Sequence, residues 1–331
     1  MRSRVLAAST AALCCAVLVS ASPYALAEDK PGGLGSELVQ TGERPPPPPS
    51  GFAGNDAVKP PIASESPTFG QAAERARIQL RSYRYSSLHG NATTLDVYTP
   101  RKLTGKVGRA VGTVVLVHGG AWQTGDRIDL ESKAVRLAKS GIVAISVNYR
   151  LATEAAWPAQ RDDVDDAVAY VRQNARYFNV DTKRIVLLGS SAGGQIAAAV
   201  ATTGAGRERF RGLVTLSGLI NPRFMAETDP EYSNAVIPEK LLRCLPEDCP
   251  SAYSTATAVD NVDASDMPAL LFHSQYEEPW GPQQALEFTY AAQSVGVQAD
   301  LVTLKGSLHG VDTWFEIWPV LKPWLKHRFK A

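Results

Sequence analysis

A short run of small residues restricts the fold of this chain more than any other feature. The sequence Gly-Ser-Ser-Ala-Gly at residues 189–193 follows an aliphatic run, Ile185 to Leu188, and precedes a helix-forming run, Gly194 to Val200. Gly-x-Ser-x-Gly between a strand and a helix predicts a sharp, strained turn that needs small residues on both sides of the serine. Ser191 is therefore expected at the carboxyl end of a strand, beside the first N–H groups of a helix.

The rest of the chain alternates apolar runs with helical stretches. We expect strands at residues 92–98, 112–118, 142–149, 184–188, 212–217, 269–273 and 299–304. We expect helices between them at 130–139, 159–178, 191–203 and 282–294. Several runs are continuously apolar, which is typical of parallel strands buried on both faces. The pattern predicts one α/β domain over residues 69–331, with a mostly parallel sheet of about eight strands and helices on both faces.

The N-terminal segment has the features of a targeting signal. Residues 1–27 combine a basic start, an apolar run and a final Ala-Leu-Ala, which predicts a secretory signal peptide and a secreted or periplasmic protein. The alternative is an uncleaved membrane anchor, because residues 5–21 approach the ~18 needed to begin to span a bilayer. Residues 28–68 are rich in Gly, Pro and Ser, and we expect a disordered linker with polyproline character there.

Charge and cysteine content limit the possible partners. Without Arg2 and Arg4 of the predicted signal peptide, the 34 Lys and Arg become 32, against 33 Asp and Glu. This balance gives no electrostatic reason to expect nucleic acid or anionic lipid as a partner, and no stable membrane insertion is expected after cleavage. Cys244 and Cys249 remain and predict a local disulfide, with two free thiols as the alternative. No further ligands for a metal lie near them.

Two other segments carry distinct expectations. Residues 221–262 form a long, polar excursion that contains both remaining cysteines. Excursions at the carboxyl ends of strands often form lids or substrate walls, so a lid or cap is one expectation and an ordinary surface excursion is the other. Residues 311–329 carry apolar side chains at helical spacing, which predicts core packing, and we expect Pro319 and Pro323 to interrupt the helix.

A serine hydroxyl is a poor nucleophile and needs a base. Of the five histidines, His309 is the favoured candidate, because it lies in a loop of small residues after the last strand, at the same sheet edge as Ser191. His89 and His327 are expected at the surface. His273 ends a buried strand and is expected to be structural.

The base in turn needs a carboxylate to orient it. In the chain order Ser, acid, His, this acid follows the second-last strand, where Glu277 and Glu278 lie. Glu277 is the preferred acid and Glu278 is the alternative. Asp266 and Asp300 are expected at the opposite ends of their strands.

The third requirement is a set of donors for a developing oxyanion. The sequence His-Gly-Gly-Ala-Trp at residues 118–122 directly follows a predicted strand. Gly119 and Gly120 let the backbone approach a substrate carbonyl, so that their N–H groups can donate to the tetrahedral oxygen. The N–H of Ala192, immediately after the predicted nucleophile, adds another donor.

With these residues in place the chain resembles the α/β-hydrolases, and among them the esterase/lipase group related to hormone-sensitive lipase and the small bacterial carboxylesterases. The resemblance covers residue 88 to the C-terminus. Residues 118–126 are similar to the group's oxyanion segment. Its next block is similar to Val-Asn-Tyr-Arg-Leu at 147–151, followed by Trp-Pro-Ala-Gln at 157–160 and Asp163. The resemblance implies that His118, Trp122 and Tyr149 support the site or contact the substrate.

The resemblance also implies a reaction: hydrolysis of small or short-chain carboxylic esters through an acyl-serine intermediate, with no metal and no cofactor. Two residues depart from the usual pattern, Ala121 where many relatives have glycine, and Glu277 where aspartate is commoner. Amide or formamide hydrolysis by the same machinery is one alternative. A non-catalytic binding protein on a hydrolase scaffold is another, although retention of the serine, the histidine and both glycines favours an enzyme.

Overall fold

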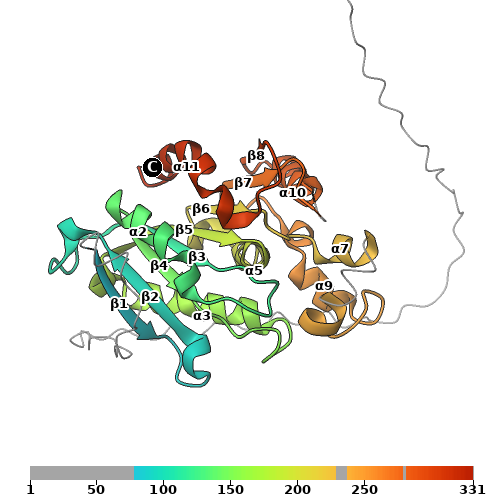
Figure 1. Cartoon of the computed structure of the whole chain (residues 1–331), viewed down its shortest axis with the longest axis horizontal. Helices are drawn as coiled ribbons and strands as arrows, with labels where there is room; N and C mark the ends of the chain where they lie inside the picture. Colours follow the sequence, from blue (N-terminus) through green and yellow to red (C-terminus); the bar gives the residue numbers. More distant parts are fainter. Residues whose placement is uncertain (1–77, 229–236, 279–280, 331) are drawn as a thin grey trace, which may run out of the picture. The chain divides into compact units, whose positions relative to one another are not determined.

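An eight-stranded sheet lies at the centre of the described chain, which in this computed structural model comprises residues 78–228, 237–278 and 281–330. The strands are β1 Gln79–Arg84, β2 Thr94–Thr99, β3 Val111–Val117, β4 Val143–Val147, β5 Val180–Ser190, β6 Gly212–Leu216, β7 Ala269–Ser274 and β8 Ala299–Leu304. Their order across the sheet is β1-β2-β4-β3-β5-β6-β7-β8 (Figure 1). Within these residues β2 pairs antiparallel with both β1 and β4, and every other pair of neighbouring strands is parallel. The predicted mostly parallel sheet is confirmed.

The strand that the sequence pattern missed is β1, at the edge of the sheet. It pairs with β2 alone and carries the polar sequence Gln-Leu-Arg-Ser-Tyr-Arg, of which only Ser82 and Tyr83 are buried. An edge strand needs few apolar residues, so its hydrophobic pattern is weak. The predicted signal peptide at 1–27, the predicted linker at 28–68 and residues 69–77 of the predicted domain lie outside the described residues.

Helices cover both faces of the sheet (Figure 1). One core packs α2 Glu131–Lys139 and α11 Trp314–Arg328 against one face of the strands. The other packs α3 Ala159–Gln173, α5 Ala192–Ala201 and α10 Gln283–Ser294 against the opposite face. Alternate residues of β3 enter the two cores, because successive side chains of a strand point to opposite faces. Short helical segments elsewhere in the described chain include η1 Gly90–Thr93, η2 Arg101–Leu103, η3 Arg127–Leu130, α4 Ala175–Phe178, α6 Gly206–Arg209, η5 Ala258–Asn261 and η6 Gly310–Thr313.

The expected interruption of the C-terminal helix is wrong. Helix α11 is continuous from Trp314 to Arg328 and contains both Pro319 and Pro323. Both prolines are exposed, whereas Trp314, Ile317, Trp318, Leu321 and Leu325 are buried against the sheet. Carbonyl groups that lose their helical partner on the solvent side can bind water. Burial of the apolar face therefore outweighs the low helix propensity of proline.

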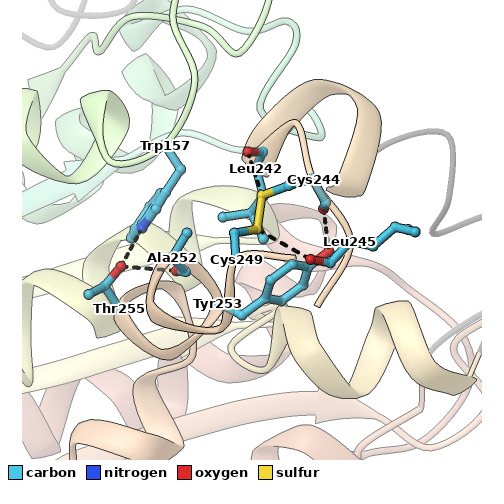
Figure 2. Close-up of a disulfide and its surroundings, with 8 residues drawn as sticks. All are labelled: Trp157, Leu242, Cys244, Leu245, Cys249, Ala252, Tyr253 and Thr255. Atoms are coloured by element: carbon cyan, nitrogen blue, oxygen red, sulfur yellow. Dashed lines mark hydrogen bonds between the residues drawn. A yellow bond between two sulfur atoms is a disulfide. The ribbon is translucent and has the colours of Figure 1, made fainter. Parts of the chain in front are cut away.

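The predicted disulfide is present and lies in the long excursion (Figure 2). This excursion contains α7 Pro222–Thr228, η4 Ile237–Leu242 and α9 Pro250–Ala256. The Cys244–Cys249 bond closes the turn before α9, and the Tyr253 hydroxyl donates to the Cys244 carbonyl at 3.2 Å. Trp157 Nε1 donates to Thr255 Oγ1 at 3.0 Å and ties α9 to the main domain. Movement of 221–262 as a lid stays a prediction.

Within the described residues, no helix has both the length and the apolar character needed to cross a bilayer.

Candidate active site

The turn between β5 and α5 has the strained geometry expected of its sequence. Ser191 lies between the two elements with φ 54° and ψ −123°, a backbone conformation that residues other than glycine rarely adopt. A Cβ at Gly189 would collide with the Gly193 carbonyl, and a Cβ at Gly193 would collide with the His118 carbonyl. The small neighbours are therefore a steric requirement. Ser191 is partly exposed, and Ala192 is buried at the first position of α5.

The glycine loop after β3 packs directly against this turn. An ideal Cβ at Gly119 would lie 3.1 Å from Ser191 Cβ and 2.9 Å from the Ser190 carbonyl oxygen, so only glycine brings the backbone this close. Gly120 has φ 113°, which also requires glycine. Trp122 Nε1 donates to Gln195 Oε1 of α5 at 2.9 Å and fixes the loop against the helix. The predicted oxyanion donors thus border the predicted nucleophile.

Two buried rings support the glycine loop. The His118 and Tyr149 rings stack with centroids 4.4 Å apart, and the Tyr149 hydroxyl donates to the His118 carbonyl at 3.0 Å. Burial lowers the pKa of His118, so its imidazole is neutral, and Nδ1 donates to the Gly119 carbonyl at 2.8 Å. His118 and Trp122 line the cavity beside Ser191. Tyr149 supports the loop from within the core, with 1% of its surface exposed.

The second block of the resemblance holds the loops after β4 together. The Arg150 guanidinium donates to both carboxylate oxygens of Asp163, at 2.8 and 2.7 Å. Gln160 Nε2 donates to the Arg150 carbonyl at 3.0 Å. Such a paired, hydrogen-bonded ion pair fixes the orientation of both partners. These contacts fix the segment after β4 against α3, and none of the three residues lines the cavity beside Ser191.

The structure distinguishes the two candidate glutamates. Glu277 Oε1 lies 2.5 Å from His309 Nδ1, and its side chain is 3% exposed. Glu278 is exposed and lines the cavity. Burial raises the pKa of Glu277, but hydrogen bonds from His309 and Ser217 and the nearby His273 more than offset it, so the pKa lies below its usual value. Glu277 is therefore the glutamate that contacts the imidazole, and it is ionised at neutral pH.

Ser191, His309 and Glu277 line one cavity of about 680 Å³, together with Gly119 and Gly120. The His309 side chain is 49% exposed. Among the described residues, no hydrogen bond joins Ser191 Oγ to the imidazole. Hydrogen bonds of this kind are often long in the absence of substrate and tighten only in the complex. The arrangement can transfer a proton from a hydroxyl to an imidazole that is held by a carboxylate.

The other histidines and acids lie where the sequence places them, with one difference. His89 and His327 are exposed, and Asp266 lies before β7, at the end opposite Glu277. His273 is buried, as expected, but it is more than a core residue, because its Nε2 lies 3.7 Å from Glu277 Oε2. Sequence reasoning missed Ser217, which donates to Glu277. Its position directly after β6, at the same sheet edge, is the signal that could have identified it.

A protein-family model matches the part of the chain that contains most of this site. A family model described as BD-FAE matches residues 95–291, which is more than half of the chain. The chain belongs to the BD-FAE family of α/β-hydrolases. The matched residues of the BD-FAE domain include the glycine loop, the turn at Ser191 and Glu277, and they end before His309.

Curated proteins similar to this chain are esterases. The esterase LipC of Mycobacterium tuberculosis is 27% identical over 264 residues, which cover 70% of this chain and 60% of LipC. The carboxylesterase NlhH of the same organism is 31% identical over 210 residues, which cover 60% of this chain and 65% of NlhH. The matches thus span less than two thirds of the length of either curated relative. The predicted esterase/lipase family is confirmed.

A solved structure gives the same fold. A truncated form of a carbohydrate esterase from gut microbiota superposes with a TM-score of 0.66 and 22% identity. The superposition covers 76% of this chain and 96% of that protein. At this identity the likeness establishes the fold, and the predicted α/β-hydrolase architecture is confirmed.

Proposed function

We propose that this protein hydrolyses carboxylic esters through an acyl-serine intermediate. The observation that carries the proposal is the 2.5 Å contact between Glu277 and His309, in the cavity that also contains the strained Ser191. The backbone of Gly119 borders the same serine. The esterase names of LipC and NlhH support the reaction class.

In the first half-reaction, Ser191 Oγ attacks the ester carbonyl carbon while His309 Nε2 takes the hydroxyl proton. Glu277 accepts a hydrogen bond from the Nδ1–H of His309, which fixes the tautomer and stabilises the imidazolium. The negative oxygen of the tetrahedral intermediate accepts hydrogen bonds from the N–H groups of Gly119, Gly120 and Ala192. Collapse breaks the bond to the alcohol, which leaves with the proton from His309.

In the second half-reaction, water attacks the acyl-serine carbonyl and gives a proton to His309. The second tetrahedral intermediate uses the same donors. Its collapse releases the carboxylic acid, and Ser191 recovers its proton from the imidazole. The two half-reactions need only groups of this chain, the ester and one water molecule.

The cavity supports small or short-chain esters as substrates. Its volume of about 680 Å³ lies within the ~300–1,000 Å³ of typical small-molecule sites. Leu130, Leu219 and Val311 contribute apolar walls, against which a short acyl chain can pack. A long acyl chain would extend beyond such a space.

Labelling with a fluorophosphonate tests the mechanism, because this reagent reacts with an activated serine. We expect stoichiometric labelling of the wild-type protein and none of Ser191→Ala. We expect Ser191→Ala to lower kcat on the order of 10⁶-fold. Equal labelling of the two proteins would refute Ser191 as the nucleophile.

A substrate panel then tests the reaction class. The panel contains p-nitrophenyl esters with acyl chains of two to about sixteen carbons, chosen to exceed the cavity volume, beside N-formyl amides. We expect the highest kcat/KM for the shortest chains. Preference for the amides would replace ester hydrolysis by amide or formamide hydrolysis, and labelling without turnover of any substrate would favour a binding protein.

We also propose that the protein is exported. The Cys244–Cys249 disulfide supports this, because disulfides persist in oxidising compartments and are rare in the cytosol. Fractionation of the natural host tests it, with detection of the protein in the periplasm or medium as the expected result. Recovery only from the cytosol, with both thiols free, would contradict export.

A further inference from the structure

Ser217 lies at the junction of the two loops that carry the predicted acid and base. It directly follows β6, is 1% exposed, and its N–H donates to the Phe272 carbonyl of β7 at 2.8 Å. Its φ of 48° is unfavourable for a residue with a side chain. Of the six non-glycine residues with positive φ in the described chain, four lie at this edge of the sheet: Ala121, Trp122, Ser191 and Ser217. Strain that gathers at one place indicates a functional constraint.

The hydroxyl of Ser217 contacts both loops at once. Ser217 Oγ donates to Glu277 Oε2 at 2.8 Å and accepts from the Gly310 N–H at 2.9 Å. Gly310 follows His309 in the chain. Glu277, His309, Gly310 and Ser217 therefore form a closed ring of contacts, with one covalent step between His309 and Gly310.

The direction of each hydrogen bond in this ring is determined. A hydroxyl has one proton and two lone pairs. Because the Gly310 N–H can only donate, it occupies a lone pair of Ser217, and the single hydroxyl proton is left for Glu277. Bonds arranged in such a chain strengthen one another. Ser217 is thus a donor to the carboxylate whenever Gly310 keeps its place.

Other contacts of Glu277 Oε2 are longer. The Ser274 N–H lies at 3.4 Å and His273 Nε2 at 3.7 Å, both beyond the usual hydrogen-bond range of 2.7–3.2 Å for nitrogen and oxygen. Without the Ser217 hydroxyl, Oε2 would keep these two longer contacts among the described residues, and the buried Gly310 N–H would lose the Ser217 oxygen as its acceptor.

We propose that Ser217 is a positioning residue that holds the Glu277 carboxylate and the His309 loop in their productive relative orientation. This inference rests on the proposed function. Ser217 acts through Glu277 and His309, and its contribution is confined to the alignment of the imidazole. Loss of its hydroxyl would leave substrate binding unchanged and slow the proton transfers.

Two substitutions separate this role from a purely structural one. Ser217→Gly removes the hydroxyl and relieves the strain at positive φ, so it is expected to fold well. Ser217→Thr keeps the hydroxyl but places a β-branched side chain at the same φ, so it is expected to be less stable. The proposal therefore predicts opposite orders: Gly is more stable than Thr by thermal unfolding, and Thr is more active than Gly.

For Ser217→Gly we expect kcat to fall roughly tenfold to hundredfold, the range for loss of a hydrogen bond to a charged group, with KM changed less than about twofold. Activity that follows stability, with Gly as active as wild type, would overturn the proposal.

A spectroscopic measurement does not depend on any substrate. The proton that Nδ1 of His309 shares with Glu277 should give a far-downfield ¹H NMR signal, identified by its loss in His309→Ala. We expect this signal to shift or broaden in Ser217→Gly and to persist in Ser217→Thr. An unchanged signal in Ser217→Gly would contradict the positioning role. A wild-type protein that hydrolyses no ester would instead contradict the proposed function and leave this measurement valid.

Discussion

Two buried carboxylates lie at opposite ends of strand β7 and differ in their acid–base properties. Glu277 follows the carboxyl end of the strand, contacts His309 and Ser217, and has a pKa below its usual value. Asp266 precedes the amino end and is 1% exposed. Burial raises the pKa of Asp266 to about 6. Its Oδ2 accepts from the Asp263 N–H at 2.9 Å, and its Oδ1 has no hydrogen-bond partner within the described chain.

The comparison shows what decides the sign of a buried acid's pKa shift. Burial raises the pKa of both groups, because it disfavours the charged form. At Glu277 the imidazoles of His309 and His273 and the hydroxyl of Ser217 reverse this effect. At Asp266 one backbone N–H and Arg207 oppose it, but they do not overcome burial and the like charge of Asp263. Whether the pKa of a buried carboxylate is raised or lowered therefore depends on the hydrogen-bond donors and charges around it, and not on burial alone.

The largest expected effect is the loss of activity on substitution of Glu277. Glu277→Gln should lower kcat about 10⁴-fold, the scale found when the acid that orients a catalytic histidine loses its charge. Steady-state kinetics on a short-chain ester measures this. Glu278→Gln is the matched control, because Glu278 is adjacent, exposed and lines the same cavity, and its kcat should fall far less than that of Glu277→Gln, since it leaves the contact with His309 in place. The reverse result would assign the acid to Glu278.

The same substitution also affects stability, with a defined pH dependence. Glu277→Gln should lower the free energy of unfolding by roughly 2 kcal/mol at pH 7, the scale of a hydrogen bond to a charged group. Because the folded-state pKa of Glu277 is depressed, its stabilisation is present above the unfolded pKa. The difference between variant and wild type should shrink as the pH falls through the folded pKa. Urea unfolding at a series of pH values measures it, and a gap that widens in acid would contradict the lowered pKa.

Asp266→Asn should show the opposite pH dependence and a smaller effect. The charged form of Asp266 is disfavoured in the folded protein, so the penalty develops as the pH rises from about 4 to about 6. Asp266→Asn should therefore gain stability over wild type across this range, by an amount on the order of 1 kcal/mol. Thermal unfolding at pH 4 and pH 7 measures the gain. The kcat of the variant should equal that of wild type. A gain in stability at pH 4 that is absent at pH 7 would contradict the raised pKa of Asp266.

The smallest expected effect is the energetic coupling between Asp266 and Glu277, at the two ends of β7. Strand β7 has six residues, which at about 3.3 Å each separate the two sites by roughly 20 Å. Stability changes at sites this far apart usually add within about 0.5 kcal/mol. The double variant Asp266→Asn with Glu277→Gln should therefore equal the sum of the single variants. A larger deviation would show that the strand couples its ends.

Much of the site could be predicted from local sequence because its steric requirements are local. The turn at Ser191 and the loop at Gly119 need small residues at fixed spacing, so their sequence identifies them. The buried parallel strands are recognisable because they are apolar on both faces. The edge strand β1 was not predicted, and the core packing of α11 was predicted but its continuity through two prolines was not, since both elements are stabilised by distant parts of the chain.

The sequence by itself determined the α/β architecture, the strained serine and the order in which serine, acid and base occur along the chain. It favoured Glu277 as the acid and left adjacent Glu278 as the alternative. Only the tertiary structure decided between them, because the choice depends on which carboxylate is buried beside Ser217, 60 residues earlier in the chain, and His309, 32 residues later. Hydrogen bonds between residues so far apart leave no periodic trace in the sequence, yet they determine which carboxylate is buried, contacts the imidazole and has its pKa lowered.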